Sequence, residues 1–387
     1  MSAPLIYIIA GEPSGDALGA RLMTALKERS EGAIRFAGIG GEQMAAEGME
    51  SLVPLSELAV MGLIEILPRA RQLLRRVKET VADIRRLRPQ AVVTIDSLGF
   101  NGRVAARLRA AGETIPLIHF VAPMVWVWRP GRARRMARHW NHLMALLPFE
   151  PPYFTAVGLS CAYVGHPIIE SGADRGDGAA FRRRHGIPAQ TPLLAVLPGS
   201  RHTEVTRLLQ PFAGAVDRLA ARHPDLQVVI ATTETVAERV KEAVASWKVP
   251  VHLLQGGGEK YDAFAASNAA LAASGTVALE LAMAGTPTVV AYRVAPLTRL
   301  VLSLTVKVNY MNLVNLILDR EVVPELRQGD CNPERLAREI DHLLSDERAA
   351  SAQIEASREA MRVLGLGGPS PGLNAADEVL SVIRRKV

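Results

Sequence analysis

The chain has 387 residues and a formal net charge of +6 at pH 7; 49% of its residues are hydrophobic and 22% are charged. This composition excludes extended disorder and is typical of a globular α/β protein, and the length allows two domains with separate cores. The positive charge favours an anionic partner, which is nucleic acid, a phospholipid surface or a phosphorylated substrate. With only Cys161 and Cys331, the sequence indicates a reducing compartment and no disulfide framework.

No apolar run reaches the length of a transmembrane helix, and the first one, residues 5–10, lacks the basic flank of a secretory signal. Short apolar runs instead alternate with helical periodicity. The predicted strands form two series: 5–10, 34–39, 91–95, 116–121 and 143–147, then 193–197, 226–231, 251–254, 269–273 and 288–292. Strands that are separated by helices predict βαβ units and parallel sheets.

Two such series predict an α/β fold of two doubly wound, Rossmann-like domains with parallel sheets. A glycine-interrupted passage near residues 165–177 places the boundary between a first domain of residues 1–170 and a second of residues 171–365. Another passage, rich in glycine and proline, leads to a last helix at about residues 372–387. We expect this helix to pack back on the first domain, either of its own chain or of a partner subunit.

The first predicted strand leads into a turn at residues 11–16, G-E-P-S-G-D. Ser14 is a suitable helix N-cap, and Asp16 is a favourable acid in the first helical turn. Capping does not account for the two glycines around Glu12, which leave room for a substrate. The turn is not a G-x-G-x-x-G fingerprint, so the sequence disfavours a dinucleotide oxidoreductase.

Two segments of the first half combine apolar and basic residues. Residues 58–67, which include Met61, are almost all apolar and precede a helix with one apolar and one arginine-rich face. Packing on a sheet explains the helix, whereas the apolar run is a candidate surface for an acyl chain or a bilayer. Trp126, Trp128 and Arg129 begin a basic segment, and the two indoles suit either a core or a membrane interface.

Asp96 directly follows the apolar strand 91–95, so its carboxylate is partly desolvated, which suits a general base. In isolation, an N-cap of the following helix is the simpler interpretation of this residue. His119 and His166 also lie near strand ends, but no cysteine or carboxylate stands at metal-ligand spacing from them. We therefore expect structural histidines and no metal site.

In the second half, Arg201 ends the turn L-P-G-S-R after the strand 193–197, where a guanidinium group can bind a phosphate with two hydrogen bonds. Residues 272–280, A-A-S-G-T-V-A-L-E, predict a strand end, a small-residue turn and a helix start. Free N–H groups and the helix dipole suit a phosphate there, and Glu280 can accept hydrogen bonds from sugar hydroxyls. A tight turn with a surface glutamate explains this segment equally well.

These loops share one position in the predicted fold. Glu12, Asp96, Arg201 and Ser274 each follow a strand, at the carboxyl edge where open α/β sheets bind ligands. Two of them come from each half of the chain. The sequence therefore predicts a binding cleft between the two domains.

Taken in order, the motifs resemble one family. They are A-G-E-P-S-G-D at 10–16, L-A-V-M-G at 58–62, I-D at 95–96, V-W-V-W-R at 125–129, L-P-G-S-R at 197–201, and A-S-G-T at 273–276 with Glu280. This set is similar to the lipid-A-disaccharide synthases of Gram-negative bacteria, which are inverting glycosyltransferases of GT-B fold. The match runs from residue 5 to the last predicted helix.

The resemblance implies that UDP-2,3-diacylglucosamine donates its sugar, with inversion, to the 6-hydroxyl of 2,3-diacylglucosamine 1-phosphate. The products are the β-1,6-linked lipid A disaccharide 1-phosphate and UDP. The resemblance also implies a cytoplasmic enzyme that is peripheral on the inner face of the inner membrane, contacts anionic lipids and needs no metal or other cofactor. A homodimer is left open, and nucleic acid is not expected as a partner.

The same resemblance assigns residue roles. Asp96 matches the family's catalytic acid and is expected to act as the base, with Glu12 near it, and Arg201 is expected to take up charge on the leaving diphosphate. The residues expected to bind UDP are Gly199, Ser200, Arg201, Ser274, Gly275, Thr276, Glu280 and Asn315. Those expected on the acceptor side are Glu12, Ser14, Asp16, Met61, Trp128 and Arg129.

The chain departs from the family in two segments. The family pattern Ile-Asp-x-Pro-Asp-Phe has a second acid, whereas residues 95–100 read I-D-S-L-G-F, so Asp96 must act alone or with Glu12. Residues 309–312, N-Y-M-N, differ from the family's smaller, serine-containing version. This second departure affects details of the donor pocket.

Two alternative functions stand beside this one. A UDP-N-acetylglucosamine epimerase, or a transferase with a soluble acceptor, keeps the fold but has no need of the apolar run at residues 59–67. A basic nucleic-acid-binding protein predicts salt-sensitive binding of RNA or DNA, but nothing in the chain resembles a nucleic-acid motif.

Overall fold

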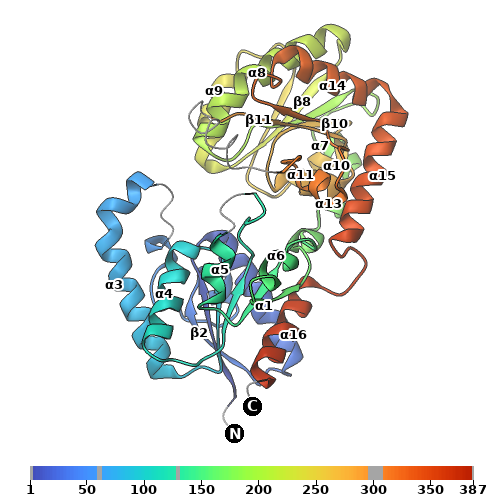
Figure 1. Cartoon of the computed structure of the whole chain (residues 1–387). Coiled ribbons are helices and arrows are strands. Elements are labelled where there is room, and N and C mark those ends of the chain that lie inside the picture. The colour runs from blue at the N-terminus through green and yellow to red at the C-terminus, as the bar shows by residue number, and fades with distance from the viewer. Residues whose placement is uncertain (1–2, 59–62, 128–130, 295–307, 386–387) are drawn as a thin grey trace. The chain divides into compact units, whose positions relative to one another are not determined.

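The structure is a computed structural model that describes residues 3–58, 63–127, 131–294 and 308–385. By its internal contacts the chain forms two compact units (Figure 1). The first consists of Met1–Pro167 and Gly367–Val387, and the second of Ile168–Leu366. The second unit is thus inserted into the first in chain order.

The first unit is built on a parallel sheet with the strand order β2-β1-β3-β4-β5-β6. Its strands are β1 Leu5–Ala10, β2 Arg35–Ile39, β3 Ala91–Ile95, β4 Leu117–Phe120, β5 His142–Ala145 and β6 Ser160–Tyr163. The strand order changes direction at β1, because β2 lies on one side of it and β3 on the other. At such a switch point the next helices leave on opposite faces and a crevice opens at the carboxyl ends of the two strands.

Helices cover both faces of this sheet: α1 Pro13–Arg29, α2 Glu42–Ala46, α3 Leu63–Leu87, α4 Leu98–Ala110, α5 Gly131–Ala137, α6 Pro151–Thr155 and α16 Pro371–Arg384. The strand β1 shows how the layers form. Its Ile6 and Ile8 pack with apolar residues of α1, whereas Tyr7 and Ile9 pack with those of α3 and α4. All four side chains are fully buried, in the alternation that a strand imposes.

The last helix, α16, belongs to the first unit and lies beside α1 (Figure 1). Its Ala375, Ala376 and Val379 are fully buried in the same apolar cluster as residues of α1. The amide Nδ2 of Asn374 donates to the backbone carbonyl of Val164 at 3.1 Å. The final segment of the chain is therefore a part of the first unit's core.

The second unit has a parallel sheet with the strand order β12-β11-β10-β7-β8-β9. Its strands are β7 Leu193–Leu197, β8 Gln227–Thr232, β9 Val251–Gln255, β10 Ala269–Ala273, β11 Thr288–Tyr292 and β12 Glu325–Arg327. Here the strand order reverses between β7 and β10, which are direct neighbours. The expected ligand crevice of this sheet is at the carboxyl ends of β7 and β10.

The helices of the second unit are α7 Gly178–Arg184, α8 His202–Arg222, α9 Ala237–Val244, α10 Lys260–Ala266, α11 Val277–Ala284, α13 Leu313–Leu318, α14 Pro333–Ser345 and α15 Glu347–Val363. They also form two layers around their sheet. From β7, Leu194 and Val196 pack with α8, α9 and α14, whereas Leu193, Ala195 and Leu197 pack with α7, α10 and α11. The alternation along the strand again gives each layer its own core.

The predicted strands of both series are confirmed, with ends that differ by at most two residues. The two strands that the sequence analysis missed, β6 and β12, are short strands at the edges of their sheets. The prediction that Ser14 is the N-cap of α1 is wrong. Glu12 takes that position and Pro13 follows at the first helical position, where its fixed φ suits a helix.

None of the helices in the described part of the structure combines the length and the apolar character that crossing a bilayer requires.

Candidate functional site

The two acids that were predicted for catalysis follow β1 and β3, at the switch point of the first unit's sheet. β1 and β3 pair in parallel up to Ala10 and Ile95, so the loops that follow them leave the same edge of the sheet side by side. Glu12 and Asp96 lie in these loops, and both are half-buried. The structure thus brings the two acid-bearing loops together at the switch point of the sheet.

The backbone after β3 has an uncommon conformation. Asp96 has φ +47° and Ser97 has φ +42°, both in the left-handed region. Each such non-glycine residue costs about 1–3 kcal/mol and persists only where its surroundings hold it in place, which happens mostly at functional sites. Ser97 is the N-cap residue of α4, so the interpretation of Asp96 as that N-cap is wrong.

Two neighbours hold this turn in place. Asn101, fully buried in α4, donates from Nδ2 to the carbonyl oxygens of Ile95 at 3.1 Å and Asp96 at 2.8 Å. Gly11 lies against Ser97, and a Cβ built on Gly11 would be 2.4 Å from the Ser97 Cβ. The room that Gly11 leaves is therefore filled by Ser97, whereas the sequence analysis assigned it to a substrate.

The other acceptor-side residues of α1 are placed differently from one another. Ser14 is exposed in the first turn of the helix. Asp16 is buried, and its two oxygens accept hydrogen bonds from the backbone N–H groups of Gly41, Gln43 and Met44 at 2.7–3.1 Å. Asp16 thus holds the start of α2, and its contact with an acceptor stays a prediction.

The remaining acceptor-side residues, Met61, Trp128 and Arg129, lie outside the described residues. The apolar run at residues 59–67 falls partly outside them as well. Trp126 is described and belongs to the core: only 9% of it is exposed, and its ring packs edge-on against Phe149. Of the two interpretations of this indole, the core position is the one that the structure shows.

A buried carboxylate that the sequence analysis missed lies next to Trp126. Glu150 Oε1 accepts from Trp126 Nε1 at 3.3 Å, and Oε2 accepts from the backbone N–H of Leu147 at 3.0 Å. Burial raises the pKa of Glu150 to about 7. This side chain links the loops that follow β4 and β5, and the only signal in the sequence was an acid directly after the apolar run L-L-P-F.

His119 and His166 are buried. Burial lowers the pKa of His119 to about 3 and that of His166 to about 4, so both rings are neutral at pH 7. His119 Nδ1 lies 2.8 Å from Oγ1 of Thr94, which is two residues before Asp96 on β3. These contacts fit the expectation of structural histidines.

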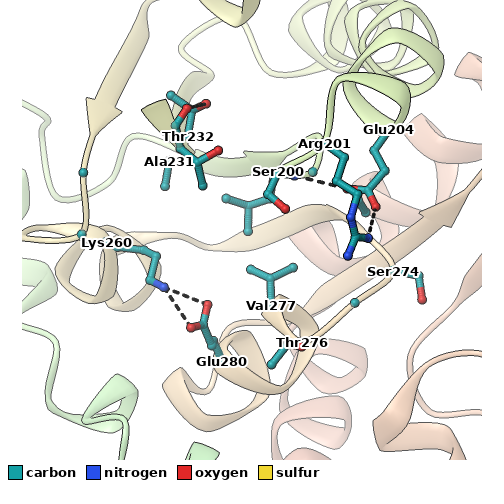
Figure 2. A pocket seen from close by; sticks show the side chains of 17 residues that line it. Ser200, Arg201, Glu204, Ala231, Thr232, Lys260, Ser274, Thr276, Val277 and Glu280 are labelled. Carbon is teal, nitrogen blue, oxygen red and sulfur yellow. Dashed lines mark hydrogen bonds and ion pairs between the residues drawn. The ribbon is translucent and has the colours of Figure 1, made fainter. Parts of the chain in front are cut away.

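The crevice of the second unit contains a pocket of about 450 Å³ at the carboxyl ends of β7 and β10 (Figure 2). Of the residues predicted to bind UDP, it brings together Gly199, Ser200, Arg201, Ser274, Gly275, Thr276 and Glu280. The other residues that line it are Leu197, Glu204, Ala231, Thr232, Thr233, Gly256, Gly257, Lys260, Ala273 and Val277. Its size lies in the range of ligand pockets, which is roughly 300–1,000 Å³.

Asn315 is the one predicted donor-site residue that does not line this pocket. It is fully buried, its Nδ2 donates to Val323 O and Glu325 Oε1, and its Oδ1 accepts from the N–H groups of Val322 and Val323. These bonds use both donors and both acceptor positions of the amide. Its contact with a nucleotide stays a prediction.

On one side of the pocket, Arg201 pairs with Glu204 (Figure 2). The Nη1–Oε1 distance is 2.9 Å, and the Arg201 side chain is 67% exposed. The other Glu204 oxygen accepts from Ser200 N–H at 3.2 Å. Gly199 has φ +109°, and a Cβ there would lie 2.5 Å from that same oxygen, so only glycine fits this turn.

On the other side, Lys260 pairs with Glu280 (Figure 2). The Lys260 Nζ lies 2.9 and 3.0 Å from the two carboxylate oxygens, and Tyr261 Oη donates to Oε1 at 3.3 Å. Glu280 was predicted from the sequence as a UDP-binding residue, whereas Lys260 was not. A signal was present, because Lys260 follows the run G-G-G-E after β9, as the other pocket residues follow β7, β8 and β10.

The arrangement suits a nucleoside diphosphate. The small-residue turn Ser274-Gly275-Thr276 opens α11, whose first N–H groups and dipole favour an anion. No atom of the described residues would lie within 4 Å of a Cβ built on Gly275, so a ligand can approach this backbone closely. A guanidinium group lies on one side of the turn and a carboxylate on the other, which matches a phosphate at one end of a ligand and a sugar at the other.

Comparison with known proteins agrees with these features. The family model described as lipid-A-disaccharide synthetase matches residues 6–366. A lipid-A-disaccharide synthase of Rhodospirillum centenum is 56% identical over 387 residues, which is 100% of this chain and 96% of that protein.

Solved structures are similar in fold. A UDP-N-acetylglucosamine 2-epimerase of Neisseria meningitidis, bound to UDP-N-acetylglucosamine, has a TM-score of 0.62 at 11% identity and covers 99% of this chain and 100% of that one. MurG of Acinetobacter baumannii has a TM-score of 0.57 at 15% identity, covering 98% of this chain and 99% of that one. At these identities the likeness is one of fold, the GT-B arrangement of two doubly wound α/β units. Since the family model and a full-length relative both match along the chain, the chain belongs to the lipid-A-disaccharide synthase family.

Proposed function

We propose that the chain transfers 2,3-diacylglucosamine from its UDP derivative to the 6-hydroxyl of 2,3-diacylglucosamine 1-phosphate. The product is a β-1,6-linked disaccharide 1-phosphate, and UDP leaves. The observation that carries this proposal is the pocket at the β7–β10 switch point, which gathers all the residues predicted to bind UDP except Asn315. Family membership supports the identity of the two acylated sugars.

In the second unit, the Ser274-Gly275-Thr276 turn and Arg201 hold the diphosphate, and Glu280 accepts from the ribose. The exposed Arg201 guanidinium is able to exchange Glu204 for a phosphate, because both are oxyanions that accept the same N–H donors. As the bond from the anomeric carbon to the diphosphate breaks, negative charge grows on UDP. Arg201 and the first N–H groups of α11 stabilise this charge.

In the first unit, Asp96 acts as the general base. The 6-hydroxyl oxygen attacks the anomeric carbon from the side opposite to UDP, its proton passes to the Asp96 carboxylate, and the electron pair of the broken bond leaves with UDP. Attack from the opposite side inverts the anomeric centre. The strained turn at Asp96 and Ser97 supports this role, because strain of this kind is retained where geometry matters for function.

The chain also acts at a membrane surface, since both acylated sugars are lipids. The face of the first unit that bears α3 and α5 carries exposed cationic side chains, which are Arg71, Arg75, Lys78, Arg134, Arg135 and Arg138. Among them Leu74 is 42% exposed, and Met124, before α5, is 54% exposed. Cations beside exposed apolar side chains favour anionic lipid, so the protein binds peripherally to the inner face of the inner membrane.

The reaction is tested by incubating the purified protein with UDP-2,3-diacylglucosamine and 2,3-diacylglucosamine 1-phosphate in detergent. We expect equal amounts of UDP and disaccharide 1-phosphate. Absence of the disaccharide would overturn the proposal. Formation of free UDP and a new isomer of the donor sugar, without the acceptor, would instead favour the epimerase alternative.

A further inference from the structure

The ion pair between Lys260 and Glu280 joins two different loops of the second unit. Lys260 begins α10, which follows β9, whereas Glu280 lies in α11, which follows β10. Both side chains line the pocket, with exposed fractions of 27% for Lys260 and 18% for Glu280. Because the pair is shielded on most sides, it is worth more than an ion pair on an open surface.

The residues around Lys260 are held in place by α7. Arg184 of α7 pairs with Glu259 and Asp262, the neighbours of Lys260, and both N–O distances are 2.7 Å. Hydrogen bonding to Arg184 lowers the pKa of Asp262, so this contact stays ionised at neutral pH. The Lys260 ammonium also lies 4.8 Å from the centre of the Tyr261 ring, at cation–π distance. The first turn of α10 is therefore anchored by α7 as well as by Glu280.

The hydrogen bonds within the pair determine which donors and acceptors of Lys260 and Glu280 remain available to a ligand. A carboxylate oxygen has two acceptor positions, and Glu280 Oε1 receives both Lys260 and Tyr261. Among the residues that the structure describes, Oε2 receives Lys260 alone, which leaves it one acceptor position. An ammonium group has three N–H donors, of which two point to Glu280, and no partner for the third is found in the described part of the chain.

One acceptor and one donor side by side match two neighbouring hydroxyl groups. In a vicinal diol, one hydroxyl can donate to Glu280 Oε2 while the oxygen of the next accepts from the Lys260 ammonium. A nucleotide has such a diol at the 2′ and 3′ positions of its ribose.

We propose that Lys260 is a positioning and specificity residue, which orients Glu280 and forms with it a binding element for the ribose diol of the nucleotide. This proposal rests on the proposed function only in that UDP occupies the pocket. It assigns the 2′ oxygen to the Lys260 ammonium and the 3′-hydroxyl to Glu280 Oε2, so that Lys260 selects ribonucleotides over 2′-deoxyribonucleotides. Removal of the ammonium frees Glu280 to turn away and removes one of the two partners of the diol.

The test compares the dissociation constants of UDP and 2′-deoxy-UDP by titration calorimetry. The wild type is expected to bind UDP about tenfold more tightly, as one lost charge-assisted hydrogen bond predicts. Lys260→Met is expected to lose this preference, so that it binds UDP and 2′-deoxy-UDP with equal and weak affinity. Lys260→Arg is expected to recover part of the preference for UDP. The KM for the UDP-sugar should rise in Lys260→Met more than kcat falls.

Lys27→Met is the matched control, because Lys27 pairs with Glu47 at 2.8 Å in the first unit, far along the chain from the pocket residues. It should leave both dissociation constants unchanged. An unchanged UDP preference in Lys260→Met, or equal binding of the two nucleotides by the wild type, would overturn the inference. If Lys260→Met fails to fold, Lys260→Arg decides, because its preference for UDP should be smaller than that of the wild type and an unchanged preference would overturn the inference. Absence of UDP binding by the wild type would instead overturn the proposed donor site itself.

Discussion

A Cβ atom on Gly11 would lie 2.4 Å from the Cβ of Ser97, which is too close for any side chain. The two residues belong to the loops after β1 and β3, so this contact locks the two loops of the first crevice together. Gly11→Ala should therefore displace the Asp96–Ser97 turn. Because a displacement of about 1 Å can cost on the order of 100-fold in rate, we expect a kcat loss of that size.

The control for this substitution lies in the first turn of α4, two positions after Ser97. Gly99→Ala adds the same methyl group where the nearest atom, on Arg103, is 3.9 Å away, and it should leave kcat unchanged. The double variant Gly11→Ala with Ser97→Gly should recover most of the lost rate. A Gly11→Ala enzyme with wild-type kcat in the disaccharide assay would show that the turn does not need this contact.

Asn101→Asp should weaken the same turn by another route. The substitution keeps the shape of the side chain, but it replaces the amide donor to the Ile95 and Asp96 carbonyls with an acceptor. Leaving a buried carbonyl without a donor costs about 1–3 kcal/mol, so we expect a lower thermal midpoint and a lower kcat with little change in UDP affinity. Equal losses of UDP affinity and rate would point to general unfolding instead.

Asp96→Asn separates the chemistry of the side chain from its backbone. Asparagine tolerates the left-handed conformation, so the turn at φ +47° should persist. Without a base, kcat should fall on the order of 100- to 10,000-fold, while the dissociation constant of UDP stays within a factor of two. Asp225→Asn, on an exposed residue of the second unit, serves as the control for loss of one charge. Near wild-type turnover in Asp96→Asn would remove Asp96 as the base.

Arg201→Ala should weaken UDP binding about tenfold and lower kcat, because the leaving diphosphate loses a cationic donor. Calorimetry and the disaccharide assay measure the two effects. The matched variant is Arg218→Ala in α8, where the arginine is exposed and donates to the backbone carbonyl of Gly214. Equal effects of the two substitutions on UDP affinity and kcat would contradict the phosphate-binding role of Arg201.

Glu150 predicts a pH dependence of stability. Its pKa is raised from 4.5 to about 7 in the folded protein, so between these values the folded state holds a proton that the unfolded state has released. The free energy of unfolding therefore falls as pH rises from 4.5 to 7 and levels off above 7. The glutamine side chain of Glu150→Gln is neutral at every pH, so this variant lacks the pH-dependent contribution to the free energy of unfolding.

We accordingly expect the thermal midpoint of Glu150→Gln, relative to wild type, to rise across this pH window and to become constant above it. Cys161, the titratable neighbour on β6, has its pKa raised to about 12 and stays neutral in the range. Glu28→Gln, at an exposed position on α1, should give a difference that does not vary with pH. A flat difference for Glu150→Gln would contradict the buried, protonated state of Glu150.

The sequence predicted most of the fold because buried parallel strands are continuous apolar runs, which leave a clear signal. β1, β3, β7 and β10, the strands that position both crevices, are of this kind. β6 and β12 were missed because edge strands bury less and need fewer apolar residues. Ser14 was wrongly predicted as the N-cap of α1 because Pro13 occupies the first helical position, which makes Glu12 the N-cap.

The lining of the candidate site was predictable where its residues directly follow a strand, as for Arg201 and Ser274. It was not predictable where function depends on contacts between loops. Lys260 reaches a carboxylate twenty positions away, and Asn101 holds backbone groups in the preceding turn. Such partners are defined by three-dimensional packing and have no fixed spacing in sequence.

The burial of α16 in the core of the first unit has a consequence for biosynthesis. Ala375, Ala376 and Val379 complete an apolar cluster whose other members lie before residue 165. During translation the second unit has therefore emerged in full before the first can close its own core. The half of the protein that is made first is the half that finishes folding last, and until then the apolar surface of α1 that α16 covers remains open to chaperones and proteases.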